Sequence, residues 1–366
     1  MHLTKGTETR MIKLNTNDFS KKAQNLLRFS DGETMHLIYT GDKLCLQTRN
    51  VTAYVSAENI GEQQAYIPQK AIALINKISS DEFQMEAADD NLTIKYNRSS
   101  SDFQMSKNFY EAKIFDDELP KMNVIDKSLL SQIKKITRYC NADTQTSNAA
   151  TGGLYFNGDG RNIEIVATDG YRLIRFKTAC KSKIKLIIPK KEIERIVALA
   201  ISEDADIECC EISMQKALFK VGDYFIITQT LIFEKFVDYK KALNFDTFPV
   251  TINVAEMRSA IERITIVNGN NKKPIIVEND NSDIRIASSA NETSKGSEFV
   301  SASFDSSKEF RRGYNGIWFA DMLSNYSGDV ELNMGVNCQT PIFIDGKSDT
   351  SSLLTMLFPM RVRDMK

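Results

Sequence analysis

A pair of segments recurs three times along this chain, at intervals far longer than those of a solenoid repeat. The first segment is an amphipathic helix in which apolar residues recur at i, i+4 and i+7. Its three copies are expected around Phe19, Ala23 and Leu26, around Leu129, Ile133 and Ile136, and around Met257, Ile261 and Ile264. A short alternating strand precedes the copies, at residues 12–14, 123–125 and 250–253.

The second segment is an extended stretch that leads into another helix. Pro68 and Pro189 mark the starts of two of these helices, because proline lacks only an N–H group that would be unpaired there. Asn315 takes the equivalent place in the third copy, where it is expected to cap the helix.

Strand patterns follow each second helix. They are expected at residues 82–86, 92–96 and 102–105, at 207–212, 217–221 and 224–228, and at 330–334 and 341–344. Each unit therefore predicts an α+β fold with antiparallel hairpins, and repeats this long are domains. We expect three repeated domains, with joints near Pro120 and Pro249, after a disordered N-terminal tail. The expected boundaries are 1–10 for the tail and 11–120, 121–248 and 249–366 for the domains.

Composition excludes several classes of protein. The chain is 42% hydrophobic and 26% charged, and no apolar run is long enough to span a bilayer. Its first ten residues lack the apolar stretch of a signal peptide, so we expect a cytoplasmic protein without membrane partners. Six cysteines without Cys-x-x-Cys spacing and only two histidines argue against a zinc site, and no cofactor is expected. Adjacent Cys209 and Cys210 are expected to fill space on opposite faces of a strand.

Motifs for catalysis are missing as well. The sequence has no Walker A loop, no dinucleotide-binding glycine pattern, no His-Glu-x-x-His and no Gly-x-Ser-x-Gly. Asn157–Gly160 and Asp169–Gly170 are instead expected to form hairpin turns, since Asp-Gly supplies a positive φ. The sequence therefore predicts that the protein is not an enzyme. An enzyme with an unrecognised carboxylate site stays open as an alternative without positive support.

Charge is distributed unevenly although the net charge is only -1. Residues 19–29 and 127–138 each contain several cations and no acid, and Lys127, Lys134 and Arg138 share one face of their helix. Cations on equivalent helices of a repeated unit suit contact with one polyanion such as nucleic acid. The alternative is that these are ordinary solvated helix faces.

Four motifs in order point to a family. Val166–Leu173, VATDGYRL, resembles the VATDGHRL signature of the bacterial replicative sliding clamp, the β subunit of DNA polymerase III. The C-terminal residues 358–362, FPMRV, resemble its Met-Pro-Met-Arg-Leu ending. Residues 236–241, FVDYKK, are similar to its Phe-Pro-Asp-Tyr-Arg-Arg, and residues 221–225, VGDYF, to its Val-Gly-Asp-Phe-Ile. With the threefold repeat, the resemblance covers nearly the whole chain.

The resemblance implies a DNA polymerase processivity factor. Two chains of three DNA-clamp domains would close head to tail into a ring, with helices lining the central hole and antiparallel sheets outside. A closed ring holds double-stranded DNA by topology, so its cations need to supply only weak, salt-sensitive and sequence-independent attraction. The implied protein partners are the replicative DNA polymerase, the clamp loader and other proteins with clamp-binding motifs, which bind through short peptides bearing Leu or Phe anchors.

The resemblance also implies functional residues. The candidates for facing DNA are Lys21, Lys22, Lys70, Lys77, Lys134, Lys135, Arg138, Gln145, Lys190, Lys191 and Arg195. At the junction between subunits, Phe103 of one copy is expected against Ile266 and Val267 of the other.

A pocket for partner peptides is implied between the second and third domains. Its expected lining is Thr151, Thr168, Gly170, Tyr171, Arg172, Leu173, Val237, Lys241, Ala242, Met356, Phe358, Pro359, Met360 and Val362. Tyr171 replaces the family histidine, Val237 its proline and Lys241 its final arginine. These departures leave open a ring homologue that encircles DNA but has lost polymerase binding.

Overall fold

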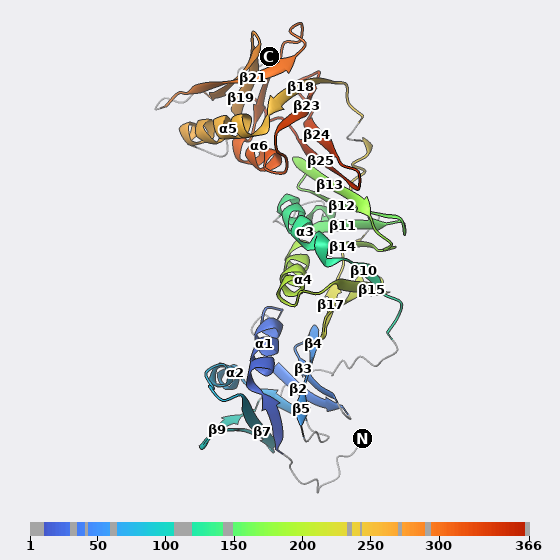
Figure 1. Cartoon of the computed structure of the whole chain (residues 1–366), viewed down its shortest axis with the longest axis vertical. Coiled ribbons are helices and arrows are strands. Elements are labelled where there is room, and N and C mark those ends of the chain that lie inside the picture. Colours follow the sequence, from blue (N-terminus) through green and yellow to red (C-terminus); the bar gives the residue numbers. More distant parts are fainter. Residues whose placement is uncertain are drawn as a thin grey trace. The chain divides into compact units, whose positions relative to one another are not determined.

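The computed structural model describes residues 11–29, 35–40, 43–58, 64–105, 119–141, 149–232, 236–241, 244–269, 273–289 and 294–362. The chain forms two compact units (Figure 1). The first unit contains Met1–Ser131 and Lys191–Thr230, and the second contains Gln132–Lys190 and Leu231–Lys366.

The first unit contains two antiparallel sheets. The five-stranded sheet has the order β5-β1-β7-β8-β9. Its strands are β1 (Ile12–Asn15), β5 (Ala57–Glu58), β7 (Glu82–Ala88), β8 (Asn91–Tyr96) and β9 (Ser99–Gln104). The eight-stranded sheet has the order β10-β15-β16-β17-β4-β3-β2-β6. Its strands are β2 (Met35–Thr40), β3 (Lys43–Gln47), β4 (Val51–Val55), β6 (Gln64–Ile67), β10 (Asn123–Ile125), β15 (Ile207–Ser213), β16 (Lys216–Val221) and β17 (Tyr224–Gln229).

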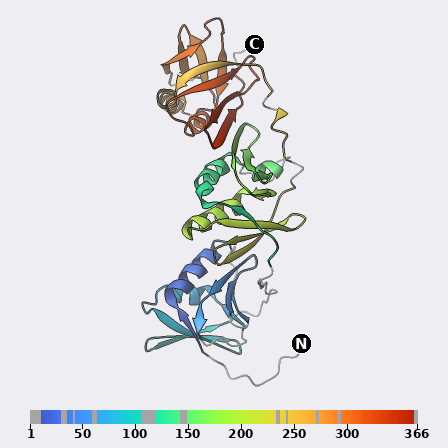
Figure 2. The ribbon, with the colours of Figure 1, turned by 45° about the vertical axis from the view of Figure 1, so that its right-hand side comes forward.

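Helices of the first unit contain the predicted apolar patterns, and α2 and α4 begin directly after Pro68 and Pro189. They are α1 (Thr16–Leu27), α2 (Gln69–Ile75), the 3-10 helix η1 (Lys127–Leu129) and all but the first residue of α4 (Lys190–Ser202). Asn15 caps α1 by accepting a hydrogen bond from the N–H of Asp18 at 2.9 Å. Helices α1 and α2 lie side by side (Figures 1 and 2), and the ring of Phe19 on α1 packs edge-on against Phe83, with centroids 5.3 Å apart.

The second unit is built on one twelve-stranded sheet of order β14-β11-β12-β13-β25-β24-β23-β18-β21-β20-β19-β22. Its first strands are β11 (Gly153–Gly158), β12 (Asn162–Thr168), β13 (Arg172–Ala179), β14 (Lys185–Pro189) and β18 (Thr247–Asn253). The others are β19 (Ile275–Asp280), β20 (Asp283–Ser288), β21 (Ser297–Phe304), β22 (Arg311–Tyr314), β23 (Asp329–Gly335), β24 (Ile342–Lys347) and β25 (Ser351–Leu357). Its helices are α3 (Leu130–Ile136), η2 (Thr137–Tyr139), η3 (Ala149–Gly152), α5 (Val254–Asn268) and α6 (Gly316–Leu323). The first two residues of α3 belong to the first unit.

Helices α5 and α6 pack against each other over the core of the second unit (Figure 1). Asn253 caps α5 by accepting hydrogen bonds from two N–H groups of its first turn, and Gly269 ends it with a φ of 64°. Asn315 accepts a hydrogen bond from the N–H of Trp318 at 3.1 Å, so its predicted capping of α6 is confirmed. The apolar sides of these helices contribute Met257 and Phe319 to a core that also contains side chains of β18 and β23.

The α+β class and the antiparallel hairpins are confirmed. Cys209 and Cys210 are both buried on β15, as expected for space-filling side chains. Pro249 lies inside β18, paired with Asn333, so the joint expected there falls within a strand. The three-domain division itself stays a prediction.

The same strand junction occurs twice. In each repeat, one strand–helix–three-strand half is followed by a second such half. In the first unit, β4 pairs antiparallel with β17, the last strand of the next repeat, so that Thr52 faces Phe225. In the second unit, β13 pairs with β25 in the same way, and Ile174 faces Thr355. By its place in the order of elements, β21 corresponds to β4 and β13, and β9 corresponds to β17 and β25.

Candidate functional site

The turn between β12 and β13 is fixed by its own side chains. Gly170 has a φ of 90°, a conformation that glycine adopts without strain. The Asp169 carboxylate accepts hydrogen bonds from the N–H groups of Tyr171 and Arg172, both at 3.0 Å. The Thr168 hydroxyl donates to the Arg172 carbonyl at 2.7 Å. The predicted Asp-Gly hairpin is therefore confirmed.

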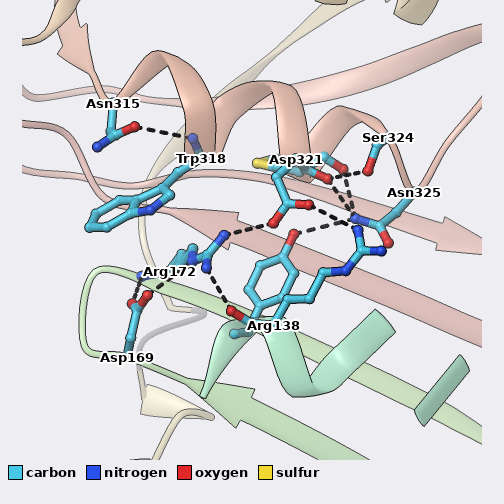
Figure 3. A network of polar contacts seen from close by, with 10 residues as sticks. Arg138, Asp169, Arg172, Asn315, Trp318, Asp321, Ser324 and Asn325 are labelled. Carbon is cyan, nitrogen blue, oxygen red and sulfur yellow. Dashed lines mark hydrogen bonds and ion pairs between the residues drawn. The ribbon is translucent and has the colours of Figure 1, made fainter. Parts of the chain in front are cut away.

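Arg172 ties this hairpin to α6 and to η2 (Figure 3). Its Nε donates to Asp169 Oδ2 at 2.9 Å, and its Nη1 donates to Asp321 Oδ2 at 2.7 Å. The remaining Nη2 donates to the carbonyl oxygen of Arg138 at 2.6 Å. Because the guanidinium is planar, it binds all three acceptors and still offers its faces to aromatic rings.

Two aromatic residues complete the surroundings of Arg172. Its Cζ lies 4.6 Å from the centroid of Tyr139 and 5.3 Å from that of Trp318. Tyr139 is buried, and its hydroxyl accepts a hydrogen bond from Asn325 at 3.3 Å. Burial raises the pKa of the Tyr139 phenol, and the nearby Asp321 carboxylate raises it further. We call Arg172, Asp169, Asp321, Tyr139 and Trp318 the arginine latch.

An apolar cluster lies beside the hairpin. It is formed by buried residues of β12, β13 and β25 together with Tyr239, and four partly buried aromatic residues pack against it. The buried members are Val166, Leu173, Tyr239, Leu354 and Met356, and the aromatic residues are Tyr155, Phe236, Phe343 and Phe358. The rings of Tyr155 and Phe236 stack at 4.5 Å, and the Tyr239 hydroxyl donates to Glu164 at 2.8 Å. The cluster gives the site an apolar wall.

The segment after β25 is held at two points. The N–H of Phe358 donates to the Tyr171 carbonyl at 2.8 Å, and the N–H of Met360 donates to the Gly313 carbonyl at 2.7 Å. A Cβ placed on Gly313 would lie 2.5 Å from Val362 Cγ2 and 3.0 Å from the Met360 carbonyl oxygen. Position 313 therefore requires glycine for the C-terminal segment, residues 358–362, to lie against β22.

The structure brings most of the predicted pocket residues together around the hairpin and the C-terminal segment. Tyr171 is 63% exposed, and its ring stacks on Trp318 with centroids 5.8 Å apart. Thr151, Thr168, Leu173 and Met356 are buried, whereas Val237, Phe358, Pro359, Met360 and Val362 are half-buried. Lys241 is exposed and lies 3.2 Å from Asp238, and Ala242 lies outside the described residues.

Three residues of the arginine latch were missed by the sequence analysis. Tyr139, Trp318 and Asp321 lie far from Arg172 in the chain, and Asp321 is separated from it by 149 residues. Trp318 carries the one usable signal, because it is the single tryptophan and follows the cap Asn315 by three residues.

The placement of Lys22 is corrected. It was predicted to face DNA, but it is 7% exposed. Its ammonium lies 3.1 Å from Asp18 and 3.1 Å from Asp223, on the turn between β16 and β17. A charge buried in this way is retained by its two carboxylates and does not reach an outside anion.

The other predicted cations lie nearer the surface. Lys21 is exposed and forms an ion pair with Glu203 at 2.9 Å, and the exposed Arg138 lies 3.6 Å from Asp321. Also exposed are Lys70, Lys77, Lys134, Lys135 and Lys191, whereas Lys190 and Arg195 are half-buried. Gln145 lies outside the described residues.

The predicted junction residues lie on two different elements. Phe103 is half-buried on β9, which pairs only with β8 in the described part of the chain. Ile266 is 79% exposed on α5, and Val267 packs near Gly296 at the start of β21.

Among the described residues, no three His, Cys, Asp or Glu side chains are grouped to hold a metal ion. No helix in the same residues has the length and apolar character needed to cross a membrane.

The sequence of the chain is similar to those of known proteins. No family model matches the chain. The β sliding clamp of Vibrio cholerae is 23% identical over 215 residues, which cover 57% of each protein. The β sliding clamp of Haemophilus influenzae is 22% identical over 254 residues, which cover 68% of this chain and 66% of that protein. The chain's matches thus span less than two thirds of these relatives.

Solved structures match over nearly the whole chain. The β sliding clamp of C. crescentus has a TM-score of 0.83 and 18% identity, and the match covers 97% of this chain and 100% of that one. The DNA polymerase III β subunit of Thermotoga maritima has a TM-score of 0.80 and 16% identity, with 96% and 100% covered. The chain therefore has the fold of the β sliding clamps. The β sliding clamps are not enzymes.

Proposed function

We propose that this chain is a divergent β sliding clamp and a cytoplasmic DNA polymerase processivity factor, which encircles double-stranded DNA and tethers the replicative polymerase to it. The observation that carries the proposal is the repeated strand junction, β4 with β17 and β13 with β25. A third junction of the same kind needs β9 and β21, which in the proposal come from two copies of the chain. Two such junctions close a ring of two chains.

Local geometry supports equivalence of the three junction strands. A backbone hydrogen bond closes the connection before each of β4, β13 and β21, and its acceptor is the first residue of β4 and of β13 and the residue just before β21. The pairs are Thr48 with Val51, Asp169 with Arg172, and Ser288 with Gly296. In the described part of the chain, β9 pairs only with β8, and an open strand edge is an aggregation hazard unless another strand covers it. β21 pairs with β20 from Ser297 to Ser301 and with β18 only from Ala302 to Phe304.

Side chains next to β21 suit a second copy. Phe299 on β21 is 57% exposed and Ile266 on α5 is 79% exposed, so β21 and the neighbouring α5 each present a large apolar group. A hollow of about 430 Å³ between α5 and β21 is lined in part by Ala255, Ser259 and Phe299. We propose that this region, with Ile266 and Val267, receives Phe103 and β9 of the partner.

The exposed cations support contact with DNA. Lys134 and Lys135 lie on the face of α3 opposite the buried Ile133 and Ile136, and Lys70 and Lys77 are exposed at the two ends of α2. We propose that these side chains meet phosphates inside the ring, without reading sequence.

The site beside the β12–β13 hairpin is proposed to bind the short motifs of polymerase, clamp loader and other partners. The exposed Tyr171 ring, the half-buried Trp318 ring and the apolar wall at Phe358 suit Leu and Phe anchors. Tyr171 replaces the family histidine with another planar ring that stacks on Trp318, so an aromatic surface is kept.

A loading assay tests the proposal. The protein is loaded on a nicked circular plasmid with the clamp loader of its host, and DNA-bound protein is separated by gel filtration. Ring topology predicts retention on the circle and release when one restriction cut makes it linear. Equal retention on circular and linear DNA would show binding by affinity and contradict the ring.

A peptide-binding assay then distinguishes a ring that tethers polymerase from a ring that has lost polymerase binding. A peptide of sequence Gln-Leu-Ser-Leu-Phe is titrated calorimetrically into the full chain. Saturable binding supports the tethering function, whereas topological retention on DNA without peptide binding would identify a ring that has lost polymerase binding.

A further inference from the structure

A second hollow, of about 1030 Å³, lies over β22, β19 and β20 of the second unit. Its floor is set by strand register, because residues directly opposite each other in a sheet share a face. One row across the strands is Gly313, Ile276, Ala287 and Ser297. These mostly small side chains leave a depression on the side of the sheet that faces away from the core, and we call it the basic groove.

Long charged side chains form the sides of the basic groove. The adjacent row contains Arg311, Glu278 and Arg285, and Lys273 and Lys295 lie near the loops at the other end. Among the described residues of the lining there are one carboxylate, Glu278, and five cations, which are Lys273, Arg285, Lys295, Arg311 and Arg361. Such an excess contrasts with the net charge of -1 of the whole chain.

The single carboxylate is already paired. Glu278 accepts hydrogen bonds from Arg285 at 2.5 Å and from Arg311 at 2.8 Å. Lys273, Lys295 and Arg361 are exposed at the rim. The groove therefore presents positive charge to any segment that enters it.

The basic groove continues from the candidate peptide site. Arg361 and Val362 line it, and they follow Met360 in the C-terminal segment that also borders the hairpin. Gly313 is the shared contact, since its carbonyl accepts from Met360 and Val362 fills the space beside its Cα. A peptide bound beside Phe358 and Met360 would have one end directed to the groove.

We propose that the basic groove binds an acidic segment flanking the clamp-binding motif of a partner, so that charge next to the motif selects among partners. The proposal rests on the peptide-binding function proposed above. A protein segment fits the groove better than single-stranded nucleic acid, because no aromatic side chain in the described lining could stack on bases.

The experiment compares three peptides on the full chain by fluorescence anisotropy. One is Gln-Leu-Ser-Leu-Phe alone, and the others have four Glu residues added before or after it. One of the extended peptides is expected to bind about fivefold more tightly at low ionic strength, through several exposed ion pairs. The gain should shrink as salt is added, because these charges are screened.

Two variants locate the gain. In the double variant Lys273→Glu and Lys295→Glu, the gain is expected to disappear while the plain peptide binds as before, since both side chains are exposed. The matched control, Lys216→Glu and Lys308→Glu, changes two exposed lysines outside the groove and should keep the gain.

The outcomes are separable. Binding of the plain peptide without any gain from Glu overturns the basic groove alone, and so does a gain that survives Lys273→Glu and Lys295→Glu. If the plain peptide fails to bind, the tethering function fails, and the groove proposal falls with it. A dT oligonucleotide that binds more tightly than the extended peptides and loses binding in the double variant would mark a nucleic-acid groove instead.

Discussion

At the scale of single residues, the arginine latch shows why Arg172 is not replaceable by lysine. Three acceptors and two aromatic rings surround its guanidinium, and its side chain is 11% exposed. An ammonium is a point charge that cannot donate in three directions across a plane and stack at once.

Arg172→Lys is therefore expected to destabilise the second unit by about 1–3 kcal/mol. Trp318, the single tryptophan, lies over the guanidinium, so urea unfolding followed by its fluorescence reports this unit. Arg161→Lys, at an exposed turn position, is the matched control. An unchanged midpoint in Arg172→Lys would show that the latch is not stabilising.

Tyr139 predicts a dependence on alkaline pH. Burial raises its pKa, so the neutral phenol is favoured in the folded protein and the unfolded chain loses the proton first. Its contribution to stability is fully present below about pH 10 and is lost as pH rises above that value. Tyr139→Phe should flatten the alkaline decline of the unfolding midpoint, and an equally steep decline would contradict this.

At the scale of elements, the C-terminal segment contacts both the β12–β13 hairpin and β22. Phe358 packs on the apolar cluster, while Pro359, Met360 and Val362 follow it toward β22. Because Phe358 takes part in packing, a cut that tests the wall should fall after it.

Removal of residues 359–366 is expected to weaken binding of Gln-Leu-Ser-Leu-Phe by tenfold or more, since each large buried side chain contributes about 1.5–3 kcal/mol. The hydrogen bond from Phe358 to Tyr171 remains, which preserves the fold. Calorimetric titration measures the change. A chain cut after Val362 serves as the control, and equal affinity for all three chains would place the pocket elsewhere.

The basic face of α3 carries the next prediction. Arg138 is left unchanged, because its carbonyl and guanidinium both serve the arginine latch. Lys134→Glu with Lys135→Glu is expected to reduce loading on DNA and to lower the salt slope by about one for each phosphate that the variant no longer neutralises. Normal loading at every salt concentration would mean that the helix face is only solvated.

At the scale of the whole molecule, the proposed ring closure rests on β9, which pairs only with β8 in the described part of the chain, and on the exposed apolar side chains of α5 and β21. Ile266→Asp places a charge at the proposed contact with Phe103 and is expected to give folded monomers in sedimentation. Ile266 is changed alone because Val267 packs near Gly296 within its own unit. Met214→Asp, also at an exposed apolar position, should leave the dimer intact. A dimeric Ile266→Asp protein would refute this assignment of the junction.

Periodicity predicted local structure well and tertiary neighbours poorly. The strand at 123–125 and the helical stretch at 127–138 were located because their patterns are local. Lys22 was misplaced because Asp223, from a hairpin about 200 residues away in the chain, covers a helix face that the pattern assigns to solvent. The contact of Arg172 with Asp321 has no local signature either. The pocket motif was found only through its resemblance to a family.

The pairing of β13 with β25 has a consequence for synthesis. Thr178 of β13 pairs with Ser351, so the ribosome must add more than 170 residues before this edge has its partner. At about 5–20 residues per second, the edge stays open on the order of ten seconds or longer. During that time the nascent chain exposes a strand that other chains can pair with, and a chaperone that shields it would raise the yield of folded protein. Completion of the twelve-stranded sheet therefore waits for β25.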